Sequence, residues 1–484
     1  MSSAAIISFS AYVSILLFIG IYFYYKQEEK RLSDYVLAGR NVGMIPTGIS
    51  QVASVATGFV FFAWVGAGFL IGLSNLWYSF LFITANVVVY RFVGSRIRRQ
   101  SEEYDSVTIV DHMVKHYQRR REENVSHMMR FFGTLTAAVF LIAFIGAQFI
   151  ALGSSMEIVL GVDYAVAIIL GGLVVAVYTT LGGFNASIWT DVVQAIVVIF
   201  GLLAIPILAM NEIGGWWAFI EEARSIDPLL LSWHGGETPQ AFLLTILAWI
   251  GLALPAVGAP HSVQRMQAIR SERFLSGASV AAATFDTMRY VIPLFIGICA
   301  RILYGSVDNP ENAAMMLIVD LFPAWLAGIL LAGVISSILS SADSIMIVLA
   351  SDFTRNAYES YISPDATEQQ AIVVGKIIVV VTAFVGIIIA LLQPATILDI
   401  VFFAWLGLGA SLGAPLIAVL FYSQLTGEGA VAGVVVGLVS TVTAQYLYPE
   451  LYPIIVWPLT IFAIIGVSRL RPRAQPTKTV ETGD

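Results

Sequence analysis

The sequence predicts an all-α integral membrane protein with about 13 transmembrane helices. Of its 484 residues, 58% are hydrophobic and only 12% are charged, and the mean hydropathy is +0.84. These values lie outside the range of soluble globular domains. Window after window holds about 20 mainly apolar residues, the length that a helix needs to cross about 30 Å of hydrocarbon.

The hydropathy criterion places the apolar segments in order along the chain. The first has no basic start and no clear cleavage site, so we expect a retained helix and not a signal peptide. The predicted segments are 4–25, 45–72, 74–95, 130–157, 163–180, 186–210, 240–264, 275–303, 322–352, 371–392, 395–422, 429–447 and 451–468.

Lys and Arg are distributed unevenly among the loops between these segments. If the N-terminus is outside, the inner loops and tail collect most of the 25 Lys and Arg residues, among them Arg98, Arg120 and Arg265, while the outer side keeps only Arg224 and Arg301. Positive charge in short loops stays cytoplasmic. We therefore expect a multi-pass protein of the plasma (inner) membrane with its N-terminus outside and its C-terminus in the cytoplasm.

Two of the apolar segments contain helix-breaking residues. The second segment includes SQVASVATGF (50–59), where small and polar residues surround Gly58, and the seventh includes LALPAVGAPH (252–261), with Pro255 and Pro260. Non-helical backbone is tolerated at membrane depth only where protein or a water-filled cavity satisfies its hydrogen-bonding groups. Ordinary kinks are the alternative, but the breaks fall in the first and sixth of ten successive helices, the spacing expected of two inverted five-helix repeats.

This spacing gives a division of the chain into five parts. We expect the tail to be disordered because it is polar and rich in Pro and Thr. The parts are an extra N-terminal helix with a cytoplasmic loop (1–44), the first five-helix repeat (45–212), the second repeat with an outer loop (213–422), two C-terminal helices (423–468) and a cytoplasmic tail (469–484).

The ninth apolar segment carries a stripe of polar side chains. On a helix, Ser337, Ser340, Ser341 and Ser344 fall within one arc of about 100°, with Asp343 at its edge. Hydroxyl and carbonyl oxygens, without nitrogen or thiol ligands, are the ligands that hard cations prefer. Oxygens facing the broken second segment therefore favour a Na+ site. The alternative is that the serines bond to their own helix or let two helices pack closely.

A second polar stripe, in the sixth apolar segment, contains Asp191. At 1.5 Å per residue, Asp191 lies about 8 Å from the inner end of its helix and Asp343 about 13 Å from that of its own. A charge at such depth costs several kcal/mol unless it is paired or solvated, so both acids are candidate functional residues. Asp286 and Arg289, spaced i, i+3 in the eighth segment, are interpreted as a structural ion pair, with a place in an outer vestibule as the alternative.

Three stretches carry a resemblance to a known family. GGFNASIWTDVVQ (182–194) has two glycines before a small residue and then an aromatic-Thr-Asp-x-x-Gln run. SSADSIMIVLASDFTRNAY (340–358) is a serine-rich helix with a Thr-containing exit, and GAPHSVQR (258–265) has a Gly-x-Pro-His-x-x-x-Arg pattern. In these features the chain resembles the sodium:solute symporters, and the third stretch is typical of their sodium/proline branch. The resemblance covers nearly the whole chain.

The resemblance implies a leucine-transporter-type 5+5 inverted repeat with discontinuous first and sixth core helices. It also implies three groups of site residues. The Na+ ligands would be the carbonyls of Ala53, Ala56 and Ser337 and the hydroxyls of Ser340 and Ser341. A second cation would contact Asp191, Ser340, Asp343 and Ser344. The substrate pocket would be lined by Thr57, Gly58, Phe59, Phe144, Gln148, Ala256, Gly258 and Trp405, the last as a lid.

The chain departs from the sodium/proline pattern near both breaks. Val55 stands where those transporters carry an acid, Phe59 replaces a Trp, and Leu252 and Ala256 stand where they place aromatic residues. Cation coupling is compatible with these changes. Proline as the substrate does not follow from the resemblance.

These observations predict a Na+-coupled secondary active symporter that imports a small organic solute, such as proline or a related carboxylate, by alternating access. The alternatives are a proton-coupled carrier that uses Asp191 or Asp343, and a membrane sensor built on a transporter fold. An enzyme is not expected, because the sequence shows no nucleophile-base-orienter set or metal motif. We expect Na+ as the co-transported ion, no organic cofactor, the lipid bilayer and a small solute as partners, no nucleic acid, and a monomer as the functional unit.

Overall fold

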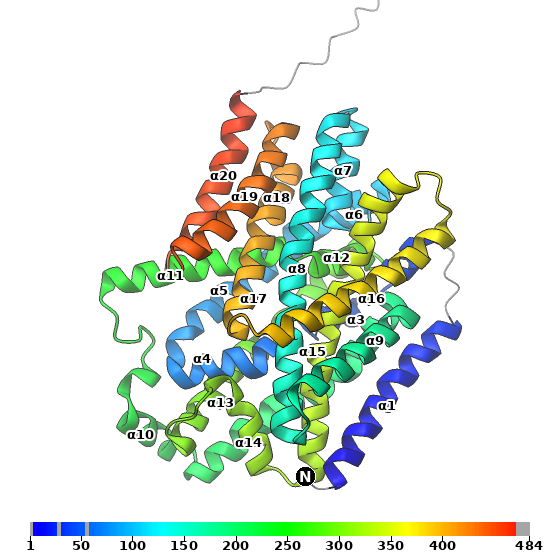
Figure 1. Ribbon diagram of the computed structural model, residues 1–484. Coiled ribbons are helices and arrows are strands. Elements are labelled where there is room, and N and C mark those ends of the chain that lie inside the picture. Colours follow the sequence, from blue (N-terminus) through cyan, green and yellow to red (C-terminus); the bar gives the residue numbers. More distant parts are fainter. Residues whose placement is uncertain (1–2, 27–30, 54–57, 471–484) are drawn as a thin grey trace, which may run out of the picture.

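A computed structural model describes residues 3–26, 31–53 and 58–470 as a helical protein, shown in Figure 1. The first half of the chain contains α1 (Ser3–Lys26), α2 (Leu32–Leu37), α3 (Met44–Ala53), α4 (Trp64–Leu70), α5 (Leu76–Val88), α6 (Gly94–Tyr104), α7 (Ile109–Arg119), α8 (Glu123–Leu160), α9 (Tyr164–Ile213) and α10 (Trp216–Ile226). The second half contains α11 (Pro239–Ala253), α12 (Pro260–Ala268), α13 (Leu275–Tyr304), α14 (Ala313–Leu321), α15 (Ala324–Phe353), α16 (Glu368–Leu392), α17 (Ile397–Leu408), α18 (Ala414–Phe421), α19 (Gly427–Leu447) and α20 (Tyr452–Leu470).

Short turns with a different helical pitch link several of these helices. Wide π-helical turns occupy Phe59–Ala63, Val89–Val93, Thr354–Ile362 and Gly409–Gly413. Tighter 3₁₀ turns occupy Ala38–Arg40, Gly72–Asn75, Pro228–Leu231, Leu254–Val257, Glu272–Phe274 and Pro310–Asn312.

Eleven helical segments of the described chain are long and apolar enough to cross a membrane, and they coincide with 11 of the 13 predicted spans. The other two predicted spans coincide with α1 and with the interrupted pair α3 and α4. The prediction of about 13 spans is therefore confirmed. The repeat boundaries at 45–212 and 213–422 stay a prediction.

The second predicted interruption separates α11 from α12. The first falls on residues 54–57, which lie outside the described part: α3 is described as far as Ala53, and Gly58 is helical and leads into the π-helical turn at Phe59. In the second interruption a 3₁₀ turn at Leu254–Val257 follows α11, and the backbone is extended at Ala259 before α12 begins. Pro255 and Pro260 lie at the start of this 3₁₀ turn and of α12, where proline is favourable because a backbone N–H is not needed for the helix.

The helices pack in two groups that face each other across the interruptions. One group holds α3, α4, α5, α11, α12 and α13, and the other holds α8, α15, α16 and the first part of α9 (Figure 1). Gly183 divides α9 into two spans, because its positive φ of 54° turns the chain where a side chain would collide with Tyr35.

Inside the first group, α4 and α13 touch backbone to backbone. A Cβ on Gly297 would lie 2.1 Å from the Val65 carbonyl oxygen, and one on Gly68 would lie 2.5 Å from that of Leu294. Close by, Arg289 Nε lies 2.6 Å from Asp286 Oδ1, and both side chains are buried. This ion pair agrees with the structural interpretation of the two residues.

The close contact of α4 and α13 predicts that Gly297→Ala is destabilising. Alanine favours a helix interior over glycine by about 1 kcal/mol, but the overpacking against rigid backbone should cost about 1–3 kcal/mol or more. Gly466→Ala in α20 is the matched control, because its Cβ would meet no atom within 4 Å. We expect the thermal unfolding midpoint in detergent to fall for Gly297→Ala alone. Equal midpoints for the two variants would contradict the packing.

Candidate ion and substrate site

A cavity of about 20 Å³ lies between α3, α9, α13 and α15. Ala53, at the end of α3, and Ser337, on α15, both line it, as does Arg289, which is neutralised by Asp286. A site of about 10–15 Å³ holds one water molecule, so this space has the volume for a single small ion or water, and apolar side chains of α3, α9 and α13 form most of its wall. The structure thus brings together one residue from each of the two helices predicted to bind Na+. Ala56 lies outside the described residues.

The three serines of the predicted Na+ site are fully buried on α15. Ser341 Oγ donates to the Ser337 carbonyl at 3.0 Å, and Ser340 Oγ donates to the carboxylate of Asp191. A hydroxyl that donates its proton keeps its lone pairs for a cation. Ser340 and Ser341 are not among the described residues that line the small cavity, so the structure joins Ser337 to Ala53 there and leaves these two beside it.

Asp191 forms a buried ion pair with Arg265, whose Nη2 lies 3.1 Å from Asp191 Oδ2, and neither side chain is exposed. The same carboxylate accepts hydrogen bonds from Ser50 and Ser340. Arg265 also donates to Ser50 at 2.8 Å and to Ser344 at 3.0 Å. This corrects the assignment of Arg265 to an inner loop: it is a core residue, because the charge of Asp191 stabilises its own inside the bundle.

Asp343 is held by hydroxyl groups instead of by a cation. Tyr178 donates to it at 2.9 Å, Ser187 at 2.8 Å and Ser344 at 3.1 Å. Its side chain is 0% exposed, and in the described ranges no Lys, Arg or His comes within 4 Å of its carboxylate. Ser344 links it to Arg265, because that hydroxyl accepts from the guanidinium and donates to Asp343.

The residues predicted for a second cation therefore do meet. Asp191 contacts Ser340, Asp343 contacts Ser344, and Arg265 connects the two pairs. The guanidinium already supplies a positive charge beside Asp191. The negative charge of Asp343 has no such neighbour in the described chain. Of the two acids, Asp343 is therefore the one whose charge a further cation or a proton could neutralise.

A second cavity of about 20 Å³ lies between the π-helical turn at Phe59 and helices α5, α8, α13 and α17, and aromatic side chains form most of its wall. Three predicted substrate residues line it. The full lining is Phe59, Tyr78, Phe144, Tyr290, Val401, Phe402 and Trp405. The ring centroids of Phe59 and Phe402 are 5.6 Å apart and those of Phe144 and Trp405 are 6.5 Å apart, so the rings nearly fill the space. The cavity is smaller than an amino acid.

The remaining predicted substrate residues have different surroundings. Gln148 Oε1 accepts from the Gly58 N–H at 3.1 Å, which ties α8 to the end of the first interruption. Gly258 faces α17, because a Cβ there would lie 2.5 Å from the Leu408 carbonyl oxygen. Ala256 is buried but does not line the aromatic cavity. Thr57 lies outside the described residues.

The sequence reasoning missed that His261 borders the aromatic cavity. Its ring is 5.9 Å from that of Trp405 and 6.4 Å from that of Phe144, and it is 1% exposed. Neither ring nitrogen has a hydrogen-bond partner in the described chain, and neither has Trp405 Nε1. The signal was present, since His261 belongs to the Gly-x-Pro-His-x-x-x-Arg stretch. Tyr78, Tyr290 and Phe402 carried no signal that separates them from ordinary packing.

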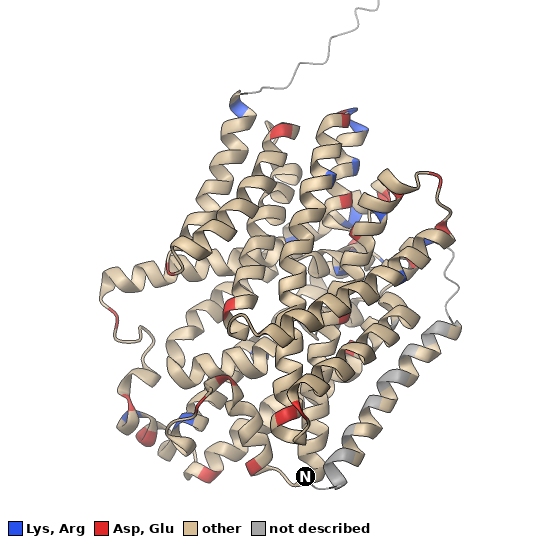
Figure 2. Cartoon of the chain, viewed as in Figure 1, with Lys and Arg blue, Asp and Glu red and all other residues tan. Residues whose placement is uncertain are grey.

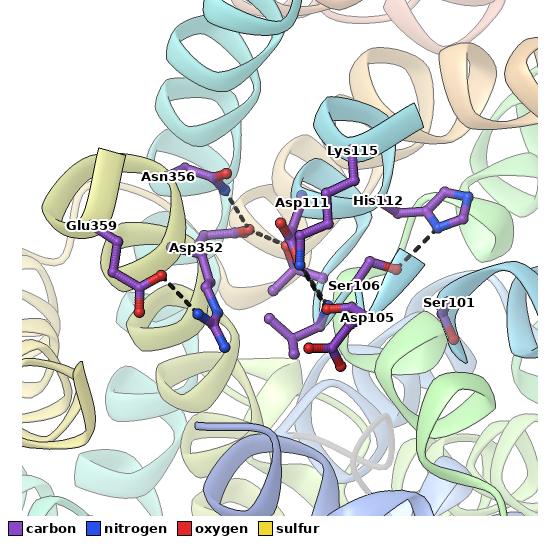
Figure 3. A network of polar contacts seen from close by, with 12 residues as sticks. Ser101, Asp105, Ser106, Asp111, His112, Lys115, Asp352, Asn356 and Glu359 are labelled. Atoms are coloured by element: carbon purple, nitrogen blue, oxygen red, sulfur yellow. Dashed lines mark hydrogen bonds and ion pairs between the residues drawn. The ribbon is translucent and has the colours of Figure 1, made fainter. Parts of the chain in front are cut away.

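A polar network at the basic end of the molecule joins α7 to α15 (Figure 3). Thr108 caps α7 by accepting from the Asp111 N–H at 3.1 Å and donates to Asp352 of α15. Asp352 also accepts from Asn356 at 3.3 Å. Capping groups of this kind fix the start of a helix. The network therefore connects the short helix α7 to the C-terminal end of the serine-bearing helix α15.

Comparison with known proteins places the chain in a family. The model of the sodium:solute symporter family matches residues 35–437. The chain belongs to the sodium:solute symporter family. It is therefore a transporter and not an enzyme, and its family couples solute movement to sodium.

This symporter has proline transporters among its relatives. It is 28% identical to the osmoregulated proline transporter OpuE of Bacillus subtilis over 90% of this chain and 88% of the relative. It is 27% identical to the sodium/proline symporter of Escherichia coli over 96% and 92%, and 29% identical to the high-affinity proline transporter PutP of Bacillus subtilis over 88% and 89%.

The fold of the symporter is that of several solved transporters. A Na+-coupled sialic acid symporter in a substrate-bound outward-open state matches with a TM-score of 0.80, at 18% identity over 98% of this chain and 100% of that one. The inward-facing form of Mhp1 matches with a TM-score of 0.54, at 16% identity over 92% and 94%. MhsT in complex with L-phenylalanine matches with a TM-score of 0.55, at 16% identity over 88% and 97%. The predicted leucine-transporter-type fold is confirmed.

The buried pair of Asp191 and Arg265 predicts a double-mutant signature. Arg265→Gln and Asp191→Asn each leave one uncompensated buried charge, which should cost about 3–5 kcal/mol. The double variant removes both charges and should recover much of that loss. The measurement is thermal unfolding of the purified symporter. Arg270→Gln is the control, because the Arg270 side chain donates to Asn41 at the exposed surface. If the double variant unfolds at or below the temperature of the less stable single variant, the pairing is refuted.

Proposed function

We propose that this symporter imports a small organic solute together with Na+ by alternating access. The solute would be an amino acid such as proline, or a related carboxylate. The observation that carries the proposal is the ion-sized cavity that Ala53 and Ser337 share beside the interrupted first core helix, in a chain of this family. Such a site, between a broken helix and its neighbour, is where transporters of this architecture hold ions.

The proposed Na+ ligands are all oxygen atoms, which suits a hard monovalent cation. They are the carbonyls of Ala53, Ala56 and Ser337 and the hydroxyls of Ser340 and Ser341. An ion held between α3 and α15 joins the two helix groups, so its binding favours one arrangement of the groups and its release permits the other. At 100 mV each monovalent ion contributes about 2.3 kcal/mol, or about 50-fold accumulation of the solute.

The aromatic cavity supports a solute with an apolar body and a polar end. Phe59, Phe144 and Phe402 offer apolar surface, while the His261 ring and Trp405 Nε1 offer polar groups without partners in the described chain. Small-ligand sites commonly combine apolar walls with a few such polar groups. The proline transporters among the relatives fit this chemistry.

Coupling to protons is a second candidate, and Asp343 favours it. This acid is fully buried and faces three hydroxyl groups, without an ion pair in the described chain. A carboxyl in such a place can carry a proton or a second cation through the membrane. In the Na+ proposal Asp343, Asp191, Ser340 and Ser344 would contact the second cation.

We also propose the arrangement of the symporter in the membrane. Figure 2 shows Lys and Arg gathered at the end where α7 and α20 terminate, which supports a cytoplasmic location for that end. The N-terminus would then be outside. The units that move would be built from the repeats at 45–212 and 213–422, within a monomer.

Removing the Ser341 hydroxyl should weaken Na+ coupling. In proteoliposomes we expect the Na+ concentration for half-maximal uptake to rise about 10-fold or more in Ser341→Ala, the effect of losing about 1.4 kcal/mol of binding. Uptake of amino acids, carboxylates, vitamins and sugars is first compared in Na+ and choline, to find the solute. The substrate should enter only with Na+.

Ser351→Ala is the matched control for this experiment. Ser351 lies on the same helix, is equally buried, and donates to Ile347 at 2.7 Å as Ser341 donates to Ser337. Its Na+ dependence should stay within about 2-fold of wild type, because the helix bond alone contributes little to binding. If both variants shift alike, or if uptake of the solute is equal in Na+ and choline, the Na+ assignment is wrong.

Asp343→Asn separates the two candidate couplings. If Na+ alone drives transport, the wild type should show no uptake driven by a pH gradient in choline. The variant should still respond to a Na+ gradient through the site at Ala53 and Ser337, with the loss of any second cation seen as a lower number of Na+ ions per solute. If protons drive transport, the wild type should respond to the pH gradient and the variant should lose that response, because Asn binds no proton in this range. The measurement is solute uptake under each gradient applied alone.

A further inference from the structure

A cavity of about 250 Å³ opens at the basic end of the molecule, away from both small cavities of the transport site. Its wall comes from α6, from α7 and the residue that follows it, from the end of α18 and from the connection between α18 and α19. The lining residues are Arg96, His116, Arg120, Val419, Leu420, Phe421, Tyr422, Ser423 and Leu425. The volume is far above the 10–15 Å³ that holds one water molecule, so it suits a group much larger than water or a bare cation.

Two guanidinium groups at this cavity form no ion pair within 4 Å in the described part of the chain. Arg96 donates to the Leu420 carbonyl and lies 4.1 Å above the Phe421 ring, while Arg120 makes no ion pair within 4 Å in the described part of the chain. Neighbouring basic residues differ, because acids neutralise them. These pairs are Arg98 with Glu102, Lys115 with Asp111, Arg119 with Glu103 and Arg355 with Glu359.

His116 adds an unsatisfied buried group to the same wall. Its side chain is 8% exposed, and neither ring nitrogen has a hydrogen-bond partner in the described chain. Burial, followed by the positive charge of Arg120, lowers the pKa of His116 to about 4, so the ring is neutral near pH 7 and can donate one N–H. Buried polar groups normally have partners, and one left open toward a cavity points to an absent ligand.

The acids of this region do not neutralise the two arginines through direct ion pairs. Glu122 and Glu428 lie near Arg120 and Tyr117, and burial raises the pKa of Glu122. Neither acid lines the cavity or forms an ion pair within 4 Å with its two arginines. The wall therefore presents net positive charge together with one neutral donor.

We propose that this cavity binds a phosphate-type anion carrying a small organic group. Two forked guanidiniums match the oxygens of a phosphate, and the His116 N–H and the Ser423 hydroxyl are further donors on the wall. The phosphate can come from an anionic phospholipid headgroup in the adjacent leaflet or from a soluble phosphorylated compound. Because the ligand would contact α6, α7 and the connection after α18 together, it would hold these three segments in one arrangement.

The test uses the purified full-length symporter in nanodiscs. Thermal unfolding is followed while inorganic phosphate is titrated into phosphatidylcholine discs, with chloride at equal ionic strength as reference, and is repeated in discs that contain phosphatidylglycerol. We expect a saturable rise in the midpoint for the wild type. The half-saturating probe concentration should rise about 10-fold in Arg96→Gln and Arg120→Gln, because each removes a charge-assisted bond.

Arg99→Gln is the matched control, because Arg99 is an exposed arginine of α6 outside the cavity wall. It should respond as the wild type does. A response to inorganic phosphate would identify a soluble ligand, and a response to phosphatidylglycerol alone would identify a lipid headgroup; either supports the site. The proposal is overturned if the wild type shows no saturable shift with either probe, a result that needs no variant, or if Arg99→Gln and Arg120→Gln weaken the response equally.

Discussion

The buried guanidinium of Arg265 is the group around which the polar interior is arranged. It contacts Ser50 of α3, Asp191 of α9, the His261 carbonyl of α12 and Ser344 of α15. A guanidinium in the membrane is expensive unless its donors are met, so these four helices must approach one another in this form. Because α12 and α15 belong to different helix groups, the same contacts hold the two groups together.

This constraint bears on transport. Movement of one group against the other must either carry the Arg265 contacts along or exchange them for others, and a bound ion between α3 and α15 would act on the same pair of groups. Hydrogen bonds to a buried charge are among the stronger ones in proteins. The described part of the bundle holds two small cavities, and the α7 network fastens α15 at the basic end. Neither cavity has the volume of an amino acid.

Sequence alone predicted the features that depend on local pattern. The spans follow from apolar length, and the second interruption follows from Pro255 and Pro260, whose effect on a helix is local. The i, i+3 spacing of Asp286 and Arg289 placed them together because a helix brings such residues to one face. The serine stripe on α15 is likewise a matter of helical period.

The rest depends on contacts between distant segments. Arg265 and Asp191 are 74 residues apart, and nothing in either segment fixes the rotation of α12 against α9 that makes them meet. Tyr290, Phe402 and His261 line or border the aromatic cavity only because α13, α17 and α12 converge there. The positive cavity near His116 is also invisible locally, since its arginines come from two helices and its carbonyl from a third.

The central claim is that oxygens of the first core helix and of α15 share one Na+. The most direct test is a high-resolution structure of the symporter in lipid with Na+, compared with one in which choline replaces it. The account predicts density for a single ion in contact with the Ala53 carbonyl and the Ser341 hydroxyl, present only with Na+. It is contradicted if these two oxygens lie too far apart to touch one ion in every state that is observed.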